Sequence, residues 1–174
     1  MAQERAGAAT FQGSPLTLLG PELKAGDKSP EFTLLANDLS TVSLRNSSGK
    51  VRLISVVPSI DTSVCDLQTR RFNQEASNLG EGVFILTVSM DLPFAQKRWC
   101  GAVGVDRVVM LSDHRDASFG MAYGTLIKEL RLESRAIFVV DQSDIIRHVE
   151  YVKEITTHPD YDAAVLAAKK AVRS

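Results

Sequence analysis

Apolar residues in this chain follow two spacings, one typical of buried strands and one typical of helices. Residues 51–57 are rich in β-branched side chains and have the length of a strand. Pro58 ends this run, because proline lacks the amide donor that a central strand requires. Ser63 and Asp66 then match a capping box, and the helix that they predict places Cys65 in its first turn. The apolar face expected for this helix consists of Val64, Leu67, Phe72, Ala76 and Leu79.

The rest of the pattern predicts strands alternating with helices, as in a layered α/β or α+β domain. A helix that begins at Pro93 weakens at Gly101 and Gly104, because glycine has a low helix propensity, so Cys100 would lie near a helix end. Two further helices are expected at residues 117–122 and 161–172. The expected strands are 32–35, 41–44, 83–88, 108–111, a hairpin of 135–140 and 145–152, and an N-terminal hairpin over 10–18 that turns at Gly13-Ser14-Pro15.

The composition is that of an ordinary globular domain. Of 174 residues, 44% are apolar and 24% charged, so we expect one domain over residues 1–174, with 1–9 flexible. A net charge of −1 disfavours a nucleic-acid partner, and no apolar run approaches the roughly 18 residues of a membrane span. The first ten residues do not resemble a secretory signal, so we expect a cytoplasmic protein.

Few residue patterns point to a metal or a cofactor. His114, His148 and His158 have no ligand spacing with one another or with the two cysteines, and no glycine-rich phosphate loop occurs. We therefore expect neither a metal nor a cofactor. Cys-x-x-Cys is also absent, which disfavours an oxidoreductase of the thioredoxin type. Two cysteines are too few for a disulfide scaffold and are more typical of a redox-active pair or of buried residues.

Cys65 is the candidate for chemistry. The unpaired amides and the positive dipole end of a helix start both favour an anion, so a thiol there tends towards thiolate. The alternative interpretation is that Cys65 is a small buried apolar residue.

The segment Pro58-Ser-Ile-Asp-Thr-Ser-Val-Cys65 resembles the Pro-x-x-x-Thr-x-x-Cys loop of the peroxiredoxins, in the form found in bacterial thiol peroxidases, the atypical two-cysteine class. The resemblance extends in order along nearly the whole chain and includes residues 89–100, 122–124, 135–141 and 154–161. It implies a thioredoxin-like fold, with a mixed central sheet flanked by helices and an N-terminal β-hairpin extension.

The same resemblance implies a role for each matching residue. Cys65 would be the peroxidatic cysteine, and Cys100 the resolving cysteine that forms a disulfide with it. Pro58 would shield the sulfur from water, Thr62 would offer a hydroxyl, and Arg135 would offer guanidinium donors. The expected substrates are hydrogen peroxide and organic hydroperoxides, the expected reductant is thioredoxin, and the expected assembly is a homodimer.

Thiolate formation by itself does not explain a fast peroxidase. Lowering a cysteine pKa from about 8.5 to about 6 raises the thiolate fraction at pH 7 roughly 30-fold. A Brønsted slope of about 0.45 then removes a little over tenfold as lost nucleophilicity, which leaves a gain of about two- to threefold. We therefore expect Arg135 and Thr62 to act mainly on the transition state.

A second hypothesis is a non-enzymatic thioredoxin-fold module whose disulfide switches the binding of a partner. Thr62 and Arg135 distinguish the two, because a switch needs only thiols whereas peroxide activation needs the surrounding donors. Glu133 departs from the usual apolar segment before Arg135 and could draw its guanidinium away from the sulfur. We also expect the helix of Cys100 to open before a disulfide forms, since two folded helices rarely bring sulfurs within bonding distance.

Overall fold

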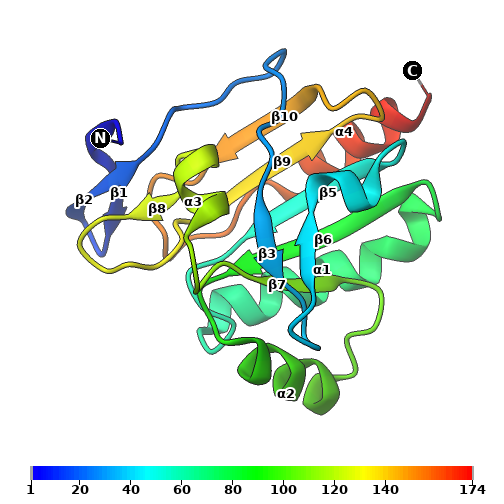
Figure 1. Ribbon diagram of the computed structural model, residues 1–174, viewed down its shortest axis with the longest axis horizontal. Helices are drawn as coiled ribbons and strands as arrows, with labels where there is room; N and C mark the ends of the chain where they lie inside the picture. The colour runs from blue at the N-terminus through cyan, green and yellow to red at the C-terminus, as the bar shows by residue number, and fades with distance from the viewer. Residues whose placement is uncertain (1, 174) are drawn as a thin grey trace.

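A mixed sheet forms the centre of the computed structural model, which describes residues 2–173 (Figure 1). Within these residues the sheet has seven strands in the order β10-β9-β5-β6-β7-β3-β4. The neighbours β5, β6 and β7 run parallel, whereas β9 pairs antiparallel with both β5 and β10, and β3 pairs antiparallel with both β7 and β4. The strands are β3 (Thr33–Leu35), β4 (Thr41–Ser43), β5 (Val51–Val56), β6 (Val83–Ser89), β7 (Val109–Ser112), β9 (Ala136–Val140) and β10 (Ile146–Tyr151).

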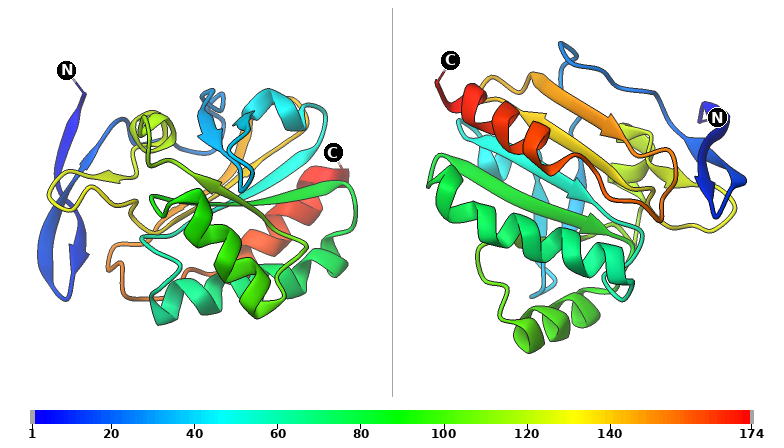
Figure 2. Two further views of the ribbon diagram at one scale, coloured as in Figure 1. Left: turned by 60° about the horizontal axis from the view of Figure 1, so that its bottom comes forward. Right: turned by 180° about the vertical axis from the view of Figure 1, so that it is seen from behind.

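Helices cover both faces of this sheet, because the side chains of its central strands are buried on both sides of the sheet. In β5, Leu53 packs into the cluster shared with α1 (Ser63–Leu79) and α4 (Tyr161–Arg173), which lie side by side over one face (Figure 2). Ile54 faces the other cluster, shared with the 3-10 helix η1 (Leu44–Ser47) and α3 (Ser118–Tyr123). A fourth α-helix, α2 (Pro93–Val103), lies at the rim of the molecule beyond α1. The expected mixed sheet with flanking helices is confirmed.

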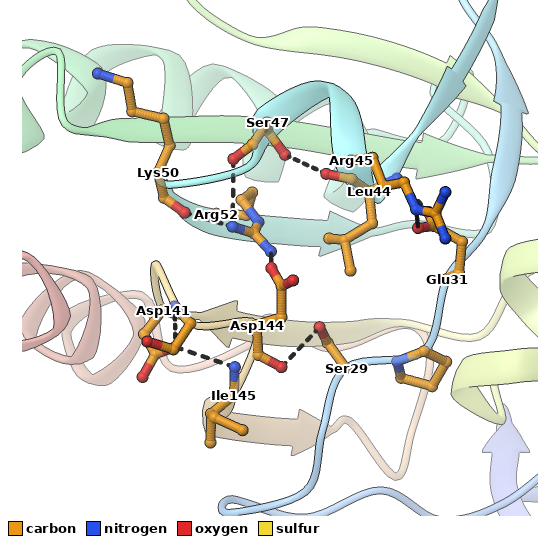
Figure 3. Close-up of polar contacts among 12 residues, drawn as sticks. Ser29, Glu31, Leu44, Arg45, Ser47, Lys50, Arg52, Asp141, Asp144 and Ile145 are labelled. Atoms are coloured by element: carbon orange, nitrogen blue, oxygen red, sulfur yellow. Dashed lines mark hydrogen bonds and ion pairs between the residues drawn. The ribbon is translucent and has the colours of Figure 1, made fainter.

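A buried arginine joins three segments on the η1 side of the sheet (Figure 3). Arg52 in β5 is fully buried and forms an ion pair with Asp144, which lies in the turn between β9 and β10. Its guanidinium also donates to the carbonyl oxygens of Lys50, at 2.6 Å, and Ser47, at 3.3 Å. The Asp144 carbonyl in turn accepts the Ser29 amide, at 2.8 Å, and the Ser29 hydroxyl, at 3.0 Å. These contacts fix the hairpin turn to the central strand.

The N-terminal hairpin is longer than expected. β1 (Glu4–Phe11) pairs with β2 (Ser14–Leu19), and β8 (Leu126–Ile127) extends them into a second sheet. The turn lies at Gln12 and Gly13, both with positive φ, and Pro15 belongs to a strand rather than to the turn. Residues 4–9, expected to be flexible, are therefore part of a paired strand. Their alanine-rich sequence gives little strand signal, and the order comes from pairing with β2.

Most other elements lie where the pattern places them, with shifts of one or a few residues at their ends. The apolar face of α1 is a partial exception, since Leu67 is 52% exposed whereas Gln68 and Thr69 are fully buried. η1 and β8 were not predicted, because segments of four and two residues are too short to show a period.

Candidate functional site

The segment between β5 and α1 positions Cys65. β5 ends at Val56, Pro58 is buried in the loop that follows, and α1 begins at Ser63, so Cys65 lies in the first turn as predicted. Its side chain is fully buried and its thiol is free.

The predicted capping box of Ser63 and Asp66 is wrong. Thr62 is the N-cap residue, and its side chain makes no capping hydrogen bond. The Asp66 carboxylate instead accepts hydrogen bonds from Arg70, at 2.7 Å, and from the indole of Trp99, at 3.0 Å. These partners lie outside the first turn, so Asp66 contributes to packing between helices rather than to the helix start.

Arg135 also contacts the sulfur. It is the residue directly before β9. Its Nη2 donates to Cys65 Sγ at 3.2 Å, Nη1 donates to Gln68 Oε1 at 2.8 Å, and Nε donates to the Ile155 carbonyl at 2.9 Å. The side chain is 2% exposed. Three acceptors in different directions hold the planar guanidinium in one orientation, with its positive charge against the sulfur.

Gln68 is a site residue that sequence reasoning missed. It lies one helical turn after Cys65 and is fully buried. Its Nε2 donates to the Ser55 hydroxyl at 2.7 Å, which leaves Oε1 free to accept Arg135. A glutamine three residues after the cysteine shares its helix face, and this spacing is the signal that could have found it.

A cleft of about 280 Å³ opens at the start of α1, where Val64, the residue before Cys65, forms part of its lining. Pro58, Thr62 and Arg135 all line it, so the structure brings these three predicted residues together. The Thr62 hydroxyl donates to the Ser59 carbonyl at 3.0 Å and not to the sulfur. A larger cleft, of about 550 Å³, lies between β10 and α4 and is lined by none of the predicted site residues. The complete lining of the smaller cleft is Phe11, Pro58, Thr62, Ser63, Val64, Arg135, Ile155 and Thr156.

Cys100 lies three residues before the end of α2, as expected, but the structure does not join it to Cys65. Both thiols are free. Cys100 is half-buried, and burial raises the pKa of its thiol, with an opposing contribution from the Asn37 side chain beside it. Asn37 follows β3, whereas Cys65 contacts Arg135 next to β9. Both cysteines nevertheless pack against the same core cluster, Cys65 as a buried member and Cys100 as a partly buried one.

Glu133 does not draw Arg135 away from the sulfur. Its side chain is fully buried and accepts the Thr125 hydroxyl at 2.6 Å, while Arg135 donates elsewhere. Burial raises the pKa of Glu133 well above its usual range, and the neighbouring Asp113 carboxylate raises it further. The three hydrogen bonds of Arg135 go to Ile155, Gln68 and Cys65, so the arginine remains available to the cysteine.

The part of the chain that the structure describes holds no candidate metal site. Among residues 2–173, no three His, Cys, Asp or Glu side chains converge as metal ligands would. In the same residues, none of the helices combines the length and the apolar character needed to cross a bilayer.

Comparisons with known proteins agree with this geometry. The redoxin family model matches residues 24–165. The thiol peroxidase of Halalkalibacterium halodurans is 64% identical over 163 residues, which cover 94% of this chain and 98% of the relative. That of Bacillus subtilis is 57% identical over 164 residues, with the same two coverages.

Solved structures show the same fold. A peroxiredoxin-like protein from Aquifex aeolicus superimposes with a TM-score of 0.89 at 38% identity and covers 95% of this chain and 98% of its own. The thioredoxin-like fold expected from the sequence is therefore confirmed. This chain belongs to the redoxin family and, within it, to the thiol peroxidases.

Proposed function

We propose that this thiol peroxidase reduces hydrogen peroxide and organic hydroperoxides at Cys65, with Cys100 as the resolving thiol and thioredoxin as the reductant. The observation that carries the proposal is the 3.2 Å contact between Arg135 Nη2 and Cys65 Sγ beside a small cleft. A buried sulfur that serves only for packing does not need a guanidinium held against it, because burying an unneutralised cation is costly.

In the first step, the Cys65 thiolate attacks one peroxide oxygen. A sulfur–oxygen bond forms and the oxygen–oxygen bond breaks, so the sulfur is oxidised to a sulfenic acid and the peroxide is reduced. The departing oxygen takes a proton and leaves as water or an alcohol. The buried Pro58 forms one wall of the cleft and, without an N–H group, offers no competing donor to the sulfur.

Arg135 and Thr62 are placed to orient the peroxide. The Arg135 guanidinium donates to oxygen and stabilises the charge that moves onto the departing atom. The Thr62 hydroxyl already donates to the Ser59 carbonyl, but a hydroxyl can also accept. In this proposal it accepts the O–H of the peroxide, so that the two residues fix both ends of the oxygen–oxygen bond.

In the second step, the Cys100 sulfur attacks the Cys65 sulfur. A disulfide forms, the sulfur–oxygen bond breaks, and the hydroxyl leaves as water with the proton of the Cys100 thiol. A dithiol of the thioredoxin type then supplies two electrons and two protons and restores both thiols. This sequence makes the chain an antioxidant peroxidase.

A coupled consumption assay tests the function. With peroxide, thioredoxin and its reductase, we expect turnover in the native protein and none in Cys65→Ser, which removes the nucleophile but little volume. Circular dichroism of Cys65→Ser establishes that it is folded. A native protein that forms the Cys65–Cys100 disulfide but sustains no turnover would instead favour the redox-switch hypothesis.

A homodimer and a cytoplasmic location belong to the same proposal, and both rest on the resemblance to the family. Light scattering of the reduced protein tests the first, since a dimer doubles the mass of the 19.0 kDa chain. Fractionation of the producing cell tests the second.

A further inference from the structure

The residue after one cysteine is hydrogen-bonded to the residue before the other. Asp66 follows Cys65, Trp99 precedes Cys100, and the Trp99 Nε1 donates to Asp66 Oδ1 at 3.0 Å. The two residues are far apart in the sequence and lie in different helices, with β6 between them. Chain connectivity therefore does not enforce this contact.

A third residue completes the contact. Arg70, one turn further along α1, donates to the second Asp66 oxygen at 2.7 Å, and its guanidinium lies 5.9 Å from the centre of the Trp99 ring. We call Asp66, Arg70 and Trp99 the helix latch. Among residues 2–173, the Asp66–Trp99 bond is the one hydrogen bond between α1 and α2. The latch is therefore the specific polar connection between the helices that carry the two thiols.

The two halves of α2 are held differently. In the first half, the buried Gln96 donates to the Ser89 hydroxyl and to the Leu111 carbonyl, both at 3.0 Å, which ties this half to the sheet. The second half, residues 97–103, contains Gly101, which stabilises a helix less than alanine by up to about 1 kcal/mol, and Gly104 follows it as the C-cap. The half that carries Cys100 is held by the Trp99–Asp66 bond, by the Asn37 side chain beside Cys100, and by the packing of Trp99, Cys100 and Val103 against the core cluster.

The thiols must travel to meet. Both thiols are free, and each has another partner: the buried Cys65 sulfur in α1 accepts Arg135, whereas Cys100 in α2 lies beside Asn37. A disulfide requires Cα atoms within about 4.4–6.8 Å. The second half of α2 therefore has to leave its position, and the latch opposes that movement.

We propose that the helix latch sets the rate at which Cys100 reaches oxidised Cys65, so that Asp66 and Trp99 are positioning residues for disulfide formation. The inference rests on the proposed function, in which Cys100 displaces water from the Cys65 sulfenic acid. While the latch is closed the sulfenic acid persists, and a second peroxide can oxidise it to a sulfinic acid. Opening also returns Cys100 to water and relieves the burial that disfavours its thiolate.

Trp99→Phe is the primary test, because it removes the indole donor and keeps an aromatic ring for packing. Arg98→Ala is the matched control, since Arg98 is an exposed neighbour in the same turn. After one equivalent of peroxide, mass spectrometry follows sulfenic acid and disulfide separately. We expect Trp99→Phe to form the disulfide roughly tenfold faster, as the loss of one charge-assisted hydrogen bond implies, with Cys65 oxidation within about twofold of native. Its sulfinic acid yield at high peroxide should fall.

A second variant and a double mutant assign the effect to the bond itself. Asp66→Ala should accelerate disulfide formation as Trp99→Phe does, and the double variant should add little to either change, because both remove the same contact. Additive effects, or a disulfide rate in Trp99→Phe equal to that of Arg98→Ala while Cys65 oxidation is normal, would overturn the proposal.

Hydrogen exchange of the reduced protein tests the latch without peroxide. Residues 97–104 should exchange roughly tenfold faster in Trp99→Phe than in Arg98→Ala, whereas the segment around Gln96 should be unchanged. Equal exchange in the two variants contradicts the latch whatever the activity. If instead exchange changes as expected but peroxide never oxidises Cys65, the proposed function fails, and the latch holds α2 without setting a rate of disulfide formation.

Discussion

At the scale of single residues, the site depends on an arginine whose acceptors leave it one orientation. Arg135 makes three hydrogen bonds, and one of them is to the reacting sulfur. Hydrogen bonds to charged groups contribute about 1.5–3 kcal/mol, so Arg135→Ala should slow Cys65 oxidation roughly 10- to 150-fold. Stopped-flow measurement of the oxidation rate checks this, with Arg71→Ala, a change at a half-buried arginine of α1 that does not contact the sulfur, as control. An unchanged rate would mean that the guanidinium does not act on the peroxide.

Thr62 allows a test of acceptor function that does not alter charge. Thr62→Val keeps the shape of the side chain and removes the hydroxyl that would accept the peroxide O–H. We expect oxidation of Cys65 to slow roughly 5- to 10-fold, since a neutral hydrogen bond contributes about 1 kcal/mol. Thr62→Ser should restore most of the rate. If serine performs no better than valine, the methyl group of Thr62 matters rather than its hydroxyl.

Glu133 makes stability depend on pH. Its pKa in the folded protein is raised above the usual 4.5 by burial and by Asp113. Between 4.5 and the folded pKa the native state holds a proton that the unfolded chain has released, so stability falls as pH rises, by up to about 1.4 kcal/mol per unit. Glu133→Gln keeps an acceptor for Thr125 and does not titrate.

We therefore expect Glu133→Gln to match the native protein near pH 4 and to exceed it at pH 8. Urea unfolding at several pH values measures this difference. A variant that is less stable than the native protein at pH 8 would show that the native side chain is ionised and favourably paired.

At the scale of elements, Asp91 connects the loop before α1 to the start of α2. Its carboxylate accepts the Ser59 hydroxyl at 2.8 Å, the Ile60 amide at 2.9 Å and the Ser89 hydroxyl at 2.6 Å. The loop that it holds also presents Pro58 and Thr62 to the cleft. Asp91 therefore controls the position of two cleft residues without lining the cleft itself.

Asp91→Ala should accordingly impair both stability and chemistry. Loss of a charged acceptor costs about 2 kcal/mol, or a fall of roughly 4–8 °C in Tm for a chain of this size. Displacement of the loop should slow Cys65 oxidation roughly tenfold. Calorimetry and stopped-flow kinetics measure the two effects, and the exposed Asp61→Ala is the control. A lower Tm with a native oxidation rate would show that Asp91 supports the fold but not the site.

At the scale of the whole molecule, Arg52 joins the central strand to the hairpin turn far along the chain. Asp144→Ala leaves its buried guanidinium without a carboxylate, which should cost about 2 kcal/mol. Asp144 has a φ of 62°, a conformation that asparagine tolerates better than alanine. Asp144→Asn should therefore recover part of the loss in chemical denaturation, while Cys65 oxidation stays native in both variants. Equal stability of Asp144→Ala and the native protein would show that backbone carbonyls alone satisfy Arg52.

The sequence by itself determined the order of the elements and the place of Cys65. A β-branched run closed by Pro58 makes β5, and helical spacing from residue 63 makes α1, because both patterns are local and periodic. The full length of the N-terminal strand was not predicted, because its first residues form a strand only by pairing with β2. The resemblance supplied Arg135, Thr62 and Cys100, which no local pattern indicates.

Only the tertiary structure decided which side chains meet. Arg135 lies 70 residues from Cys65 and reaches it because β9 pairs with β5. Packing of α2 beside α1 likewise brings Asp66 to Trp99, while both thiols remain free. Local propensity and the spacing of apolar residues determine whether each segment becomes a helix or a strand. Contacts between segments depend instead on which strand ends share an edge of the sheet. That arrangement is set by the burial of the apolar faces of all elements together.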